Sequence, residues 1–412
     1  MSQLKKKKSK LAMTRRNFMQ RASAGAALAS FTILQPKQVR GTSANSRIEI
    51  GCIGMGNRGR MLGTMIVKHE GYQIVAVADY FPEVSHRGGD LYKVAKDRRY
   101  SGLHAYKRLL AGGVDAVFLE TPPYCFPEHT AEAVNAGCHV YLAKPMGCDV
   151  PSCLKISATG KVATTKKLVF LVDFQTRTDP FYQEGVKRVK EGAVGKIGML
   201  CTEYNDESFP DPPKTKTIAS RFQDLIWCND DAVGAGYLVN AGIHAIDVAL
   251  WIAGENPVSA VGSSRMARNN PHGDSHDVYS LTYEFANGLI LSHRGEHLKN
   301  RSEFRCDCFA HGNNGFLESG YNGRVRILAN RGGYRGGVVE GLYPRGALTN
   351  INNFHKCITE GITDNPTIEP SLNATLATIL GREAARKNTK LTWDEVLKEN
   401  KRFELDYSGL TK

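Results

Sequence analysis

Along most of the chain, short apolar runs that suit buried strands alternate with segments whose apolar positions recur at helical spacing. From residue 48 onward the pattern predicts strands over Ile48–Ile53, Gln73–Asp79, Ala116–Leu119, His139–Leu142 and Leu168–Val172. Between and beside them it predicts helices over Gly59–His69, Glu83–Lys96, His104–Ala111, Pro127–Ala136 and Pro151–Thr164. Strands alternating with helices of this length are typical of βαβ units, so this part is predicted to be a doubly wound parallel sheet.

After about residue 195 the pattern changes to strands separated by glycine-rich turns. The expected strands are Lys196–Tyr204, Pro257–Met266, Asp277–Phe285, Leu289–Gly295, Phe304–Ala310, Gly315–Glu318 and Arg324–Leu328. Asn287-Gly288, between two of these runs, indicates a hairpin. Helices are expected over Gly242–Ala253, Asn350–Glu360 and Ser371–Lys387. The fold class is therefore predicted to be α/β, with an N-terminal Rossmann dinucleotide-binding domain and a C-terminal α/β domain that has an open, mainly antiparallel sheet.

The length of 412 residues suits two domains, and 42% hydrophobic with 23% charged residues is a globular composition. We expect an export segment at residues 1–44, a Rossmann domain at 45–172 and a substrate and oligomerisation domain at 173–350. Residues 351–412 are expected to form C-terminal helices that pack back on the core. The open sheet face of the second domain is a natural surface for a homo-oligomer.

The N-terminus has the order of a targeting signal. A lysine-rich stretch is followed by Thr14–Met19, which contains Arg15-Arg16, and then by the weakly apolar run Ala22–Leu34. This arrangement resembles a twin-arginine signal, which implies the twin-arginine export machinery as a partner and a periplasmic or exported location. Cleavage near residues 42–44 and retention of the segment as an anchor both remain open, and the alternative is a disordered basic arm.

The formal net charge of +13 does not indicate nucleic-acid binding, because ten positive charges and no acidic residue fall within residues 1–44. The rest of the chain is left with +3, which is no electrostatic footprint for nucleic acid. The ten cysteines show no Cys-x-x-Cys pair and no zinc spacing. We therefore expect few or no structural disulfides and no metal site.

A glycine-rich motif follows the first predicted strand. Gly54, Gly56 and Gly59 fit G-x-G-x-x-G, with Asn57 and Arg58 between the last two glycines. The motif has a strand before it, a helix after it, and an acid, Asp79, twenty residues beyond Gly59 at the end of the next strand. Glycines permit the tight turn and the close approach of a pyrophosphate, and the carboxylate suits both ribose hydroxyls. Because no arginine follows Asp79 directly, the expected cofactor is NAD rather than NADP.

Further motifs carry a family resemblance. They are Thr121-Pro122-Pro123, His129, Ala136–Val140, Lys144-Pro145 and Asn240–Asp247, with Gln175, Arg177, Pro180 and Gly192–Ile197 at the domain crossover. Their spacing resembles that of the Gfo/Idh/MocA oxidoreductases over about residues 47–390. The resemblance implies an NAD-dependent oxidation of a CH–OH group in a sugar or sugar derivative.

The resemblance also implies roles for individual residues. Lys144 and His244 would be catalytic, with Asn240 one helical turn before His244, and Thr121, Pro122, His129 and Lys144 would lie along the cofactor. We expect His244 to act as the base and Lys144 to orient and polarise the substrate oxygen, with the reverse assignment kept open. The chain departs from the family at Ala143, where the family's Glu-Lys-Pro motif has Glu. Any carboxylate that supports Lys144 must therefore come from elsewhere.

Planar polar and aromatic side chains bind sugars. The candidates for sugar contacts are Arg177, Tyr204, Asp206, Glu207, Trp227, Asp230, Asp231, Tyr237, Asn240 and His244. An exported enzyme would carry its NAD with it, and a retained cofactor must be regenerated in place. A sugar dehydrogenase, a closed sugar-to-sugar cycle, and an NAD-dependent glycosidase that oxidises C3 transiently therefore stay open, as does a non-catalytic sugar-binding homologue.

Overall fold

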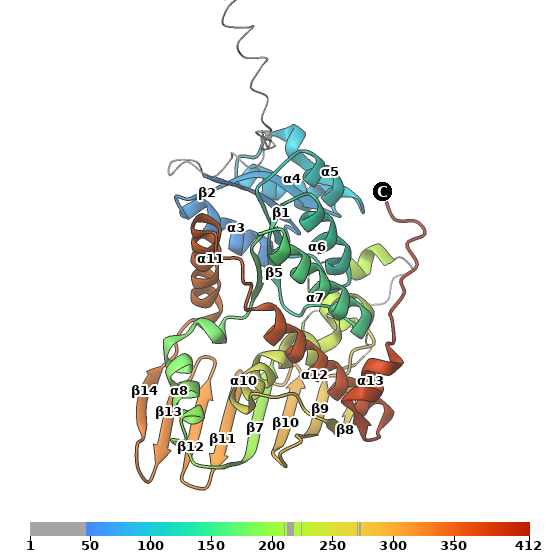
Figure 1. Cartoon of the computed structure of the whole chain (residues 1–412). Coiled ribbons are helices and arrows are strands. Elements are labelled where there is room, and N and C mark those ends of the chain that lie inside the picture. Colours follow the sequence, from blue (N-terminus) through green and yellow to red (C-terminus); the bar gives the residue numbers. More distant parts are fainter. Residues whose placement is uncertain (1–46, 210, 212–217, 224, 270, 272) are drawn as a thin grey trace, which may run out of the picture.

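The computed structural model describes residues 47–209, 211, 218–223, 225–269, 271 and 273–412. The proposed export segment therefore lies outside the described residues. Two domains follow one another along the chain, each built on one sheet (Figure 1).

The first domain has a six-stranded sheet in the order β3-β2-β1-β4-β5-β6, and every strand pair is parallel. The strands are β1 (Ile48–Ile53), β2 (Tyr72–Asp79), β3 (Arg99–Ser101), β4 (Ala116–Leu119), β5 (His139–Ala143) and β6 (Phe170–Asp173). The predicted parallel sheet is confirmed. The order reverses between β1 and β4, so the carboxyl ends of these two strands border a crevice where ligands of such sheets bind.

Helices cover both faces of this sheet. They are α3 (Asn57–Lys68), α4 (Pro82–Leu91), α5 (Ala105–Ala111), α6 (Phe126–Asn135) and α7 (Val150–Thr165). On the face covered by α3, apolar residues of β1 and β2 also pack against the C-terminal helix α11 (Leu342–Glu360), which contributes Ile351 and Phe354. Phe354 meets the rings of Phe118 and Tyr141 edge-on at 5.6 Å. A helix from the end of the chain thus completes the core of the first domain.

The second domain has a nine-stranded sheet in the order β14-β13-β12-β11-β7-β10-β9-β8-β15. The strands are β7 (Ile197–Asp206), β8 (Ser259–Arg265), β9 (Val278–Glu284), β10 (Ile290–His297), β11 (Arg305–Gly312), β12 (Gly315–Gly320), β13 (Arg324–Ala329), β14 (Tyr334–Val338) and β15 (Leu391–Thr392). All pairs are antiparallel except β10 with β7. The predicted hairpin at Asn287-Gly288 joins β9 to β10, with Gly288 at a φ of +83°.

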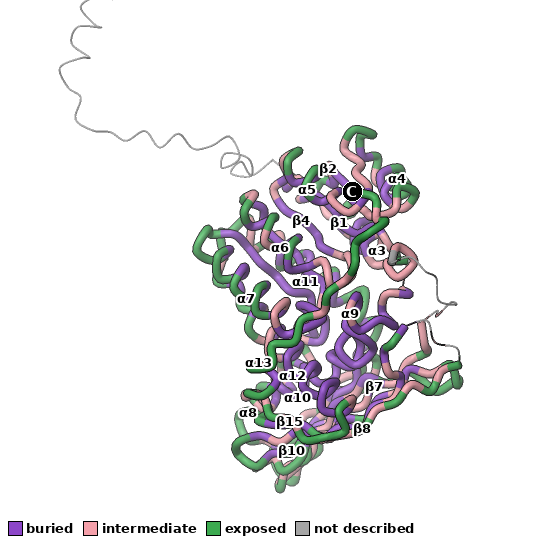
Figure 2. Tube along the Cα trace, turned by 90° about the vertical axis from the view of Figure 1, so that its right-hand side faces the viewer, coloured by how far each residue is buried: buried purple, intermediate pink, exposed green. Residues whose placement is uncertain are grey.

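One face of this sheet is covered by α8 (Pro180–Lys190), α10 (Ile243–Ala253) and α12 (Ile368–Lys387). The short helix α13 (Trp393–Glu399) packs against α12 and β15, and the short helix α9 (Asp231–Gly234) contacts the turn before α6. Figure 2 shows α9, α10 and α12 as largely buried, while exposed residues recur along the sheet. The opposite face of the sheet is open among the described residues, as expected.

The stretch Asp231–Ala253 is the one described helix whose length and hydropathy would suit a membrane span, but it is fully buried within the protein. It is therefore a buried core helix of this domain, and its α10 part packs against β7 and β11. The path of the chain brings its start to the carboxyl edge of the first sheet. That placement sets up the site between the domains.

Candidate functional site

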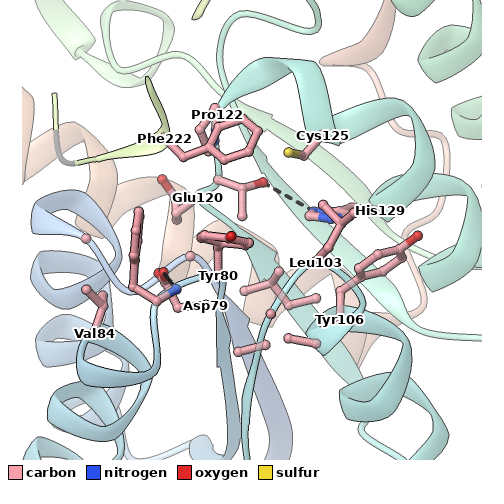
Figure 3. Close-up of a pocket in the computed structure, with 18 of the residues that line it drawn as sticks. Asp79, Tyr80, Val84, Leu103, Tyr106, Glu120, Pro122, Cys125, His129 and Phe222 are labelled. Atoms are coloured by element: carbon pink, nitrogen blue, oxygen red, sulfur yellow. Dashed lines mark hydrogen bonds between the residues drawn. The ribbon is translucent and has the colours of Figure 1, made fainter. Parts of the chain in front are cut away.

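A cavity of about 120 Å³ opens at the carboxyl edge of the first sheet. Its lining, shown in Figure 3, combines the glycine motif with the ends of β2 and β4 and with the loop before α6. We call it the nucleotide cavity; of the residues predicted to bind cofactor, Gly54, Gly56, Asp79, Thr121, Pro122 and His129 line it. Its mixed polar and apolar lining suits a small-molecule ligand.

The glycine loop has the close packing expected of a dinucleotide-binding turn, because added side chains would collide with neighbouring backbone. Gly54 has a φ of +94°, and a Cβ on it would lie 2.5 Å from the carbonyl carbon of Glu120. A Cβ on Gly59 would lie 2.0 Å from the oxygen of Gly54. Gly56 precedes α3 and supplies no side-chain cap, so the first N–H groups of that helix stay open to a phosphate.

Asp79 terminates β2 with its carboxylate at the cavity. Its Oδ2 accepts a hydrogen bond from the Met55 amide at 2.7 Å, and its Oδ1 accepts one from the Phe81 amide at 3.0 Å. Burial raises the pKa of this carboxyl group above its usual value. The described lining of the nucleotide cavity includes no Arg or Lys, so nothing there would favour a 2′-phosphate. The residues therefore fit NAD better than NADP.

Thr121 and His129 lie together at the other end of the cavity. The Thr121 hydroxyl and the His129 Nδ1 share a hydrogen bond of 3.2 Å (Figure 3). Burial lowers the pKa of His129 to about 3, and the ring packs at 4.2 Å from that of Tyr106. A neutral imidazole held in this way can order the loop, but it carries no charge for catalysis.

A second cavity of about 380 Å³ adjoins the first and shares Glu120, Thr121 and Trp227 with it. We call it the substrate cavity. It brings together all three predicted catalytic residues, which come from separate domains: Lys144 follows β5, whereas Asn240 and His244 lie at the start of the α10 region. The shared lining residues make the two cavities direct neighbours, with Glu120, Thr121 and Trp227 at their border.

Lys144 reaches across the domain boundary. Its Nζ donates to the backbone oxygen of Asn240, and the peptide bond to Pro145 is cis. Burial, and then the nearby Arg58 guanidinium, lower the pKa of Lys144 to about 8. An amine with this pKa exchanges its proton near neutral pH.

His244 lies in the same cavity with its ring between Phe174 and Tyr321, at centroid distances of 6.2 and 5.4 Å. Its Nδ1 is buried without a hydrogen-bond partner among the described groups. Burial, then the charges of Lys144 and Arg58, lower its pKa well below 6.5, so the ring is neutral. An unpartnered ring nitrogen in a cavity is free to accept a hydrogen bond or donate one to a ligand.

Asn240 contributes through its backbone. It lies in a π-helical turn, Leu238–Gly242, whose wider winding changes the carbonyl pairing just before α10. Its side-chain amide donates to the oxygen of Gly234 at 3.4 Å rather than to His244. The predicted helical pairing of Asn240 with His244 is therefore replaced by a shared lining of one cavity.

Two acidic residues of the site, Glu120 and Asp173, were missed from the sequence. Arg58, predicted to lie along the cofactor, instead lines the substrate cavity, where it pairs with Glu120 and Asp173. Glu120 directly follows β4 and Asp173 ends β6. Acids that terminate buried parallel strands meet at the carboxyl edge of a sheet, and this signal was present in the sequence.

The sugar-contact candidates separate into two groups. Tyr204, Asp206 and Trp227 line the substrate cavity, together with the aromatic rings of Phe304 and Tyr321. The remaining candidates do not line it: Arg177, Glu207, Asp230, Asp231 and Tyr237. Aromatic faces and the carboxyl groups of Asp206 and Glu120 thus surround the space beside Lys144 and His244.

The candidates outside the cavity have structural partners. Arg177 forms a two-pronged ion pair with Asp247 at 2.8 and 2.9 Å. Tyr237 donates to the Glu296 oxygen at 2.9 Å, and Asp230 caps α9 through two backbone amides at 3.0 Å. Asp231 pairs with an arginine of α12, and Glu207 lies beyond the end of β7. Apart from Glu207, their polar side-chain groups are occupied by hydrogen bonds or ion pairs within the protein.

Within the described ranges, no group of three or more His, Cys, Asp or Glu side chains is arranged to hold a metal ion. All ten cysteines are free thiols, and most are buried. Burial raises the pKa of Cys52 to about 12, so this thiol stays protonated near neutral pH.

Comparison with protein families gives two matches along the chain. Residues 48–174 match the oxidoreductase family model with an NAD-binding Rossmann fold. Residues 182–318 match the GFO/IDH/MocA C-terminal domain. The two matches meet at the boundary between the two sheets.

Curated relatives are distant. Inositol 2-dehydrogenase of Rhizobium meliloti is 24% identical over 235 residues, which cover 57% of this chain and 64% of that protein. The 2,7-anhydro-N-acetylneuraminate hydratase of Escherichia coli is 24% identical over 250 residues, covering 60% of each. The chain thus spans less than two thirds of the length of either relative.

Solved structures share the fold over nearly their whole length. Levoglucosan dehydrogenase in complex with NADH and L-sorbose has a TM-score of 0.68 at 18% identity, covering 85% of this chain and 100% of that one. Aldose-aldose oxidoreductase from Caulobacter crescentus has a TM-score of 0.66 at 21% identity, covering 84% and 99%. At these identities the likeness is one of fold.

Proposed function

The chain belongs to the Gfo/Idh/MocA family of oxidoreductases and carries its NAD-binding Rossmann domain, and on that premise we propose that it oxidises a CH–OH group of a sugar or polyol with NAD. The observation that carries this proposal is that the two cavities adjoin. Glu120, Thr121 and Trp227 line both, and Lys144 and His244 lie in the second. A dinucleotide on the glycine loop would therefore direct its reactive end toward both side chains.

The residues divide the chemistry between them. When bound, NAD supplies the acceptor for the hydride that leaves the substrate carbon. The hydroxyl proton needs an acceptor with a pKa near the working pH, and Lys144, at about 8, meets that condition. His244, held neutral, would hydrogen-bond the same or a neighbouring hydroxyl. This reverses the assignment expected from the sequence.

The lining of the substrate cavity supports a sugar or polyol as the substrate. Trp227, Tyr204 and Phe304 offer apolar faces to C–H patches, and Asp206 offers a carboxylate to paired hydroxyls. The curated and structural relatives described above bear the names of inositol and sugar enzymes. These names support the substrate class without identifying the sugar.

We also propose that the protein is exported with NAD already bound, which rests on the twin-arginine resemblance of residues 1–44 and on the fit of the nucleotide cavity to a dinucleotide. Denaturing the purified protein and identifying the released dinucleotide by mass spectrometry tests retention. Stoichiometric NAD is expected. A protein that releases no dinucleotide would contradict retention.

Activity is tested with a panel of inositols, aldoses and anhydrosugars, following absorbance of NADH at 340 nm with and without added NAD. At least one member should give NADH in the wild type and none in K144A or H244A. A panel on which wild type and both variants behave alike, while still binding sugar, would favour the non-catalytic homologue.

A second candidate is a closed redox cycle, in which the cofactor ends each turnover as it began. It is favoured by two similar proteins whose names imply no net use of NAD: the Escherichia coli hydratase and the aldose-aldose oxidoreductase. A glycosidase working through transient oxidation at C3 belongs to this class. Release of nitrophenol from nitrophenyl glycosides without added NAD and without net NADH would favour it over the dehydrogenase.

We further propose a homo-oligomer built on the open face of the nine-stranded sheet. Apolar side chains on its strands are 38–52% exposed: Met199, Val261, Ile290 and Leu328. Light scattering on purified protein should give more than one chain per particle, and charge substitutions at Ile290 and Leu328 should reduce it to one. A wild-type particle of monomer mass would contradict this.

A further inference from the structure

Four charged groups meet at the carboxyl edge of the first sheet, where the nucleotide and substrate cavities join. Arg58 comes from the first turn of α3, Glu120 follows β4, Lys144 follows β5 and Asp173 ends β6. We call these four the charge cluster. The side chains of Glu120 and Asp173 are 2% and 0% exposed, so both acids are removed from solvent.

Arg58 holds the two acids together. Its Nε lies 3.1 Å from Oε2 of Glu120, and its Nη2 donates to Oδ2 of Asp173. The guanidinium also lies 4.9 Å from the ring centre of Tyr343. An arginine fixed from three sides gives its two carboxylates a defined position.

The two acids are not equally satisfied. Oδ1 of Asp173 accepts a further hydrogen bond from Asn350 at 2.7 Å. Neither Glu120 oxygen has a hydrogen bond of good geometry among the described residues, although both are buried. A buried carboxylate with unused acceptor capacity is costly unless another group needs it. Glu120 also lines both cavities, which places it beside Lys144 and the space for the cofactor.

The net charge of the cluster indicates that Lys144 is the group that needs the Glu120 carboxylate. Arg58 and a protonated Lys144 are two cations, and Glu120 and Asp173 are two anions, so while both acids are ionised the cluster is neutral only with Lys144 charged. An unbalanced buried charge is strongly destabilising. The residue before the lysine is Ala143, which brings no carboxylate, and Asp173 is already saturated.

We propose that Glu120, held in place by Arg58, is the positioning residue that sets the charge state of Lys144 and takes the place of the carboxylate absent at position 143. Proton loss from Lys144 leaves the cluster with one excess negative charge. Glu120 then becomes the group best placed to take up a proton. A proton can therefore pass from Lys144 to Glu120 without changing the net charge of the buried cluster.

The pKa directions agree with this geometry. Burial raises the pKa of Glu120 to about 8, against the lowering effect of Arg58, and burial together with Arg58 lowers the pKa of Lys144 to about 8. Two interacting groups that titrate in one window behave as a coupled pair. The groups that face Lys144 from the surrounding elements are Arg58, Glu120, Asp173, Cys228, His244 and Cys306. Burial keeps His244 and Cys306 neutral.

The test measures the titration of Lys144 directly. Purified full-length protein is labelled briefly with acetic anhydride across pH 6–11, and the peptide containing Lys144 is quantified by mass spectrometry. Removing the anion in E120Q should lower the midpoint for Lys144 by about one pH unit, because the ammonium loses a stabilising charge. Removing the cation in R58M should raise the midpoint by a similar amount.

Glu383→Gln is the matched control, because Glu383 is also buried and paired with an arginine, 3.1 Å away, on α12. In this variant the labelling midpoint of Lys144 should equal that of the wild type. If E120Q does not fold, E120D keeps the carboxylate on a shorter side chain, and its midpoint should fall below that of the wild type by less than about one pH unit. An unchanged midpoint in E120Q, or shifts of the same sign in E120Q and R58M, would overturn the proposal.

The inference rests on the proposed function in treating Lys144 as the proton-exchanging group. The labelling readout needs no substrate, so the two can fail separately. Opposite shifts in a protein that oxidises no sugar would retain the charge cluster and reject the activity. Sugar oxidation by a protein whose Lys144 midpoint is unchanged in E120Q and R58M would retain the activity and reject the role of the charge cluster.

Discussion

Among the residues predicted to be catalytic, Lys144 has a pKa closer to neutral than His244. Its pKa is lowered to about 8, whereas that of His244 is lowered well below 6.5 by burial and by the charges beside it. A general base works best when its pKa matches the working pH. The structure thus favours Lys144 as the proton acceptor, with His244 as a neutral hydrogen-bonding partner.

A pH dependence follows for the oxidation reaction. Below pH 8 the ammonium form of Lys144 dominates and cannot accept a proton, so kcat/KM should rise about tenfold per pH unit up to pH 8 and level off above it. In the reverse direction the ammonium is the donor, and the rate should fall above pH 8. K144M should lose at least about 100-fold in both directions, while K107M, on an exposed lysine of α5, should behave as wild type. A flat profile in the wild type would argue against Lys144.

Asp79 should determine the choice of dinucleotide. Its carboxylate lies at the cavity and would repel a 2′-phosphate, so D79N should improve the affinity for NADP relative to NAD by about tenfold, or ~1.4 kcal/mol. Fluorescence titration of protein stripped of cofactor measures both affinities. D97N, at an exposed acid in the same domain, should leave the ratio unchanged. An unchanged ratio in D79N would mean that the ribose binds elsewhere.

At the scale of elements, the contact between the glycine loop and α3 can be tested by adding a single methyl group. In G59A the new Cβ would lie 2.0 Å from the Gly54 oxygen, so α3 must move away from β1. We expect a loss of about 1–3 kcal/mol in unfolding free energy together with weaker NAD binding, read from thermal melts with and without NAD. G198A is the control, because an added Cβ on that exposed residue of β7 meets nothing within 4 Å. Equal melting temperatures for G59A and G198A would contradict the close contact between Gly59 and Gly54.

The sequence was sufficient to predict elements whose pattern is local. The strands Ile48–Ile53 and Ala116–Leu119 match their predicted bounds, because both are short apolar runs bounded by turn residues. The helix expected at Glu83–Lys96 ends at Leu91 instead, and Lys93 adopts a φ of 57° just beyond it. Helix α8 was missed, although Asp179 followed by Pro180 is a capping signal, and Asp179 does cap its first turn.

The site was predictable only in part, because half of it depends on contacts between distant segments. Lys144 and His244 were identified by motif, and the structure places both in one cavity. Glu120 and Asp173 stand at two strand ends, but no spacing in the sequence reports that Arg58, in the first turn of α3, pairs with both. The π-helical turn at Leu238–Gly242 likewise arises from packing, and it changes the role of Asn240 from side chain to backbone.

At the scale of the whole molecule, the C-terminal segment links the two domains. From α13 it runs back along the nucleotide domain (Figures 1 and 2). The Phe403 amide donates to Asp149 at 2.7 Å, and the Leu103 amide donates to the Thr411 oxygen at 2.8 Å. Leu103 and Tyr80 line the nucleotide cavity, and both contact this segment. The segment therefore supports the cavity wall from outside.

Ending the chain at Asn400 should remove this support. We expect NAD to dissociate about tenfold faster, a change of ~1.4 kcal/mol in the barrier, because the wall formed by Tyr80 and Leu103 loses its outer contacts. Stopped-flow displacement of NAD measures the rate. S408A is the control, since Ser408 hydrogen-bonds to Asp406 within the segment itself. Equal rates for the truncated and full chains would show that the wall holds without it.

The central claim is that one dinucleotide lies on the glycine loop with its nicotinamide between Lys144 and His244. A crystal structure of the protein with NAD tests this most directly. The account predicts pyrophosphate at the start of α3, ribose hydroxyls at Asp79, and the nicotinamide ring inside the substrate cavity facing both side chains. A dinucleotide bound elsewhere, or a nicotinamide directed away from that cavity, would contradict it.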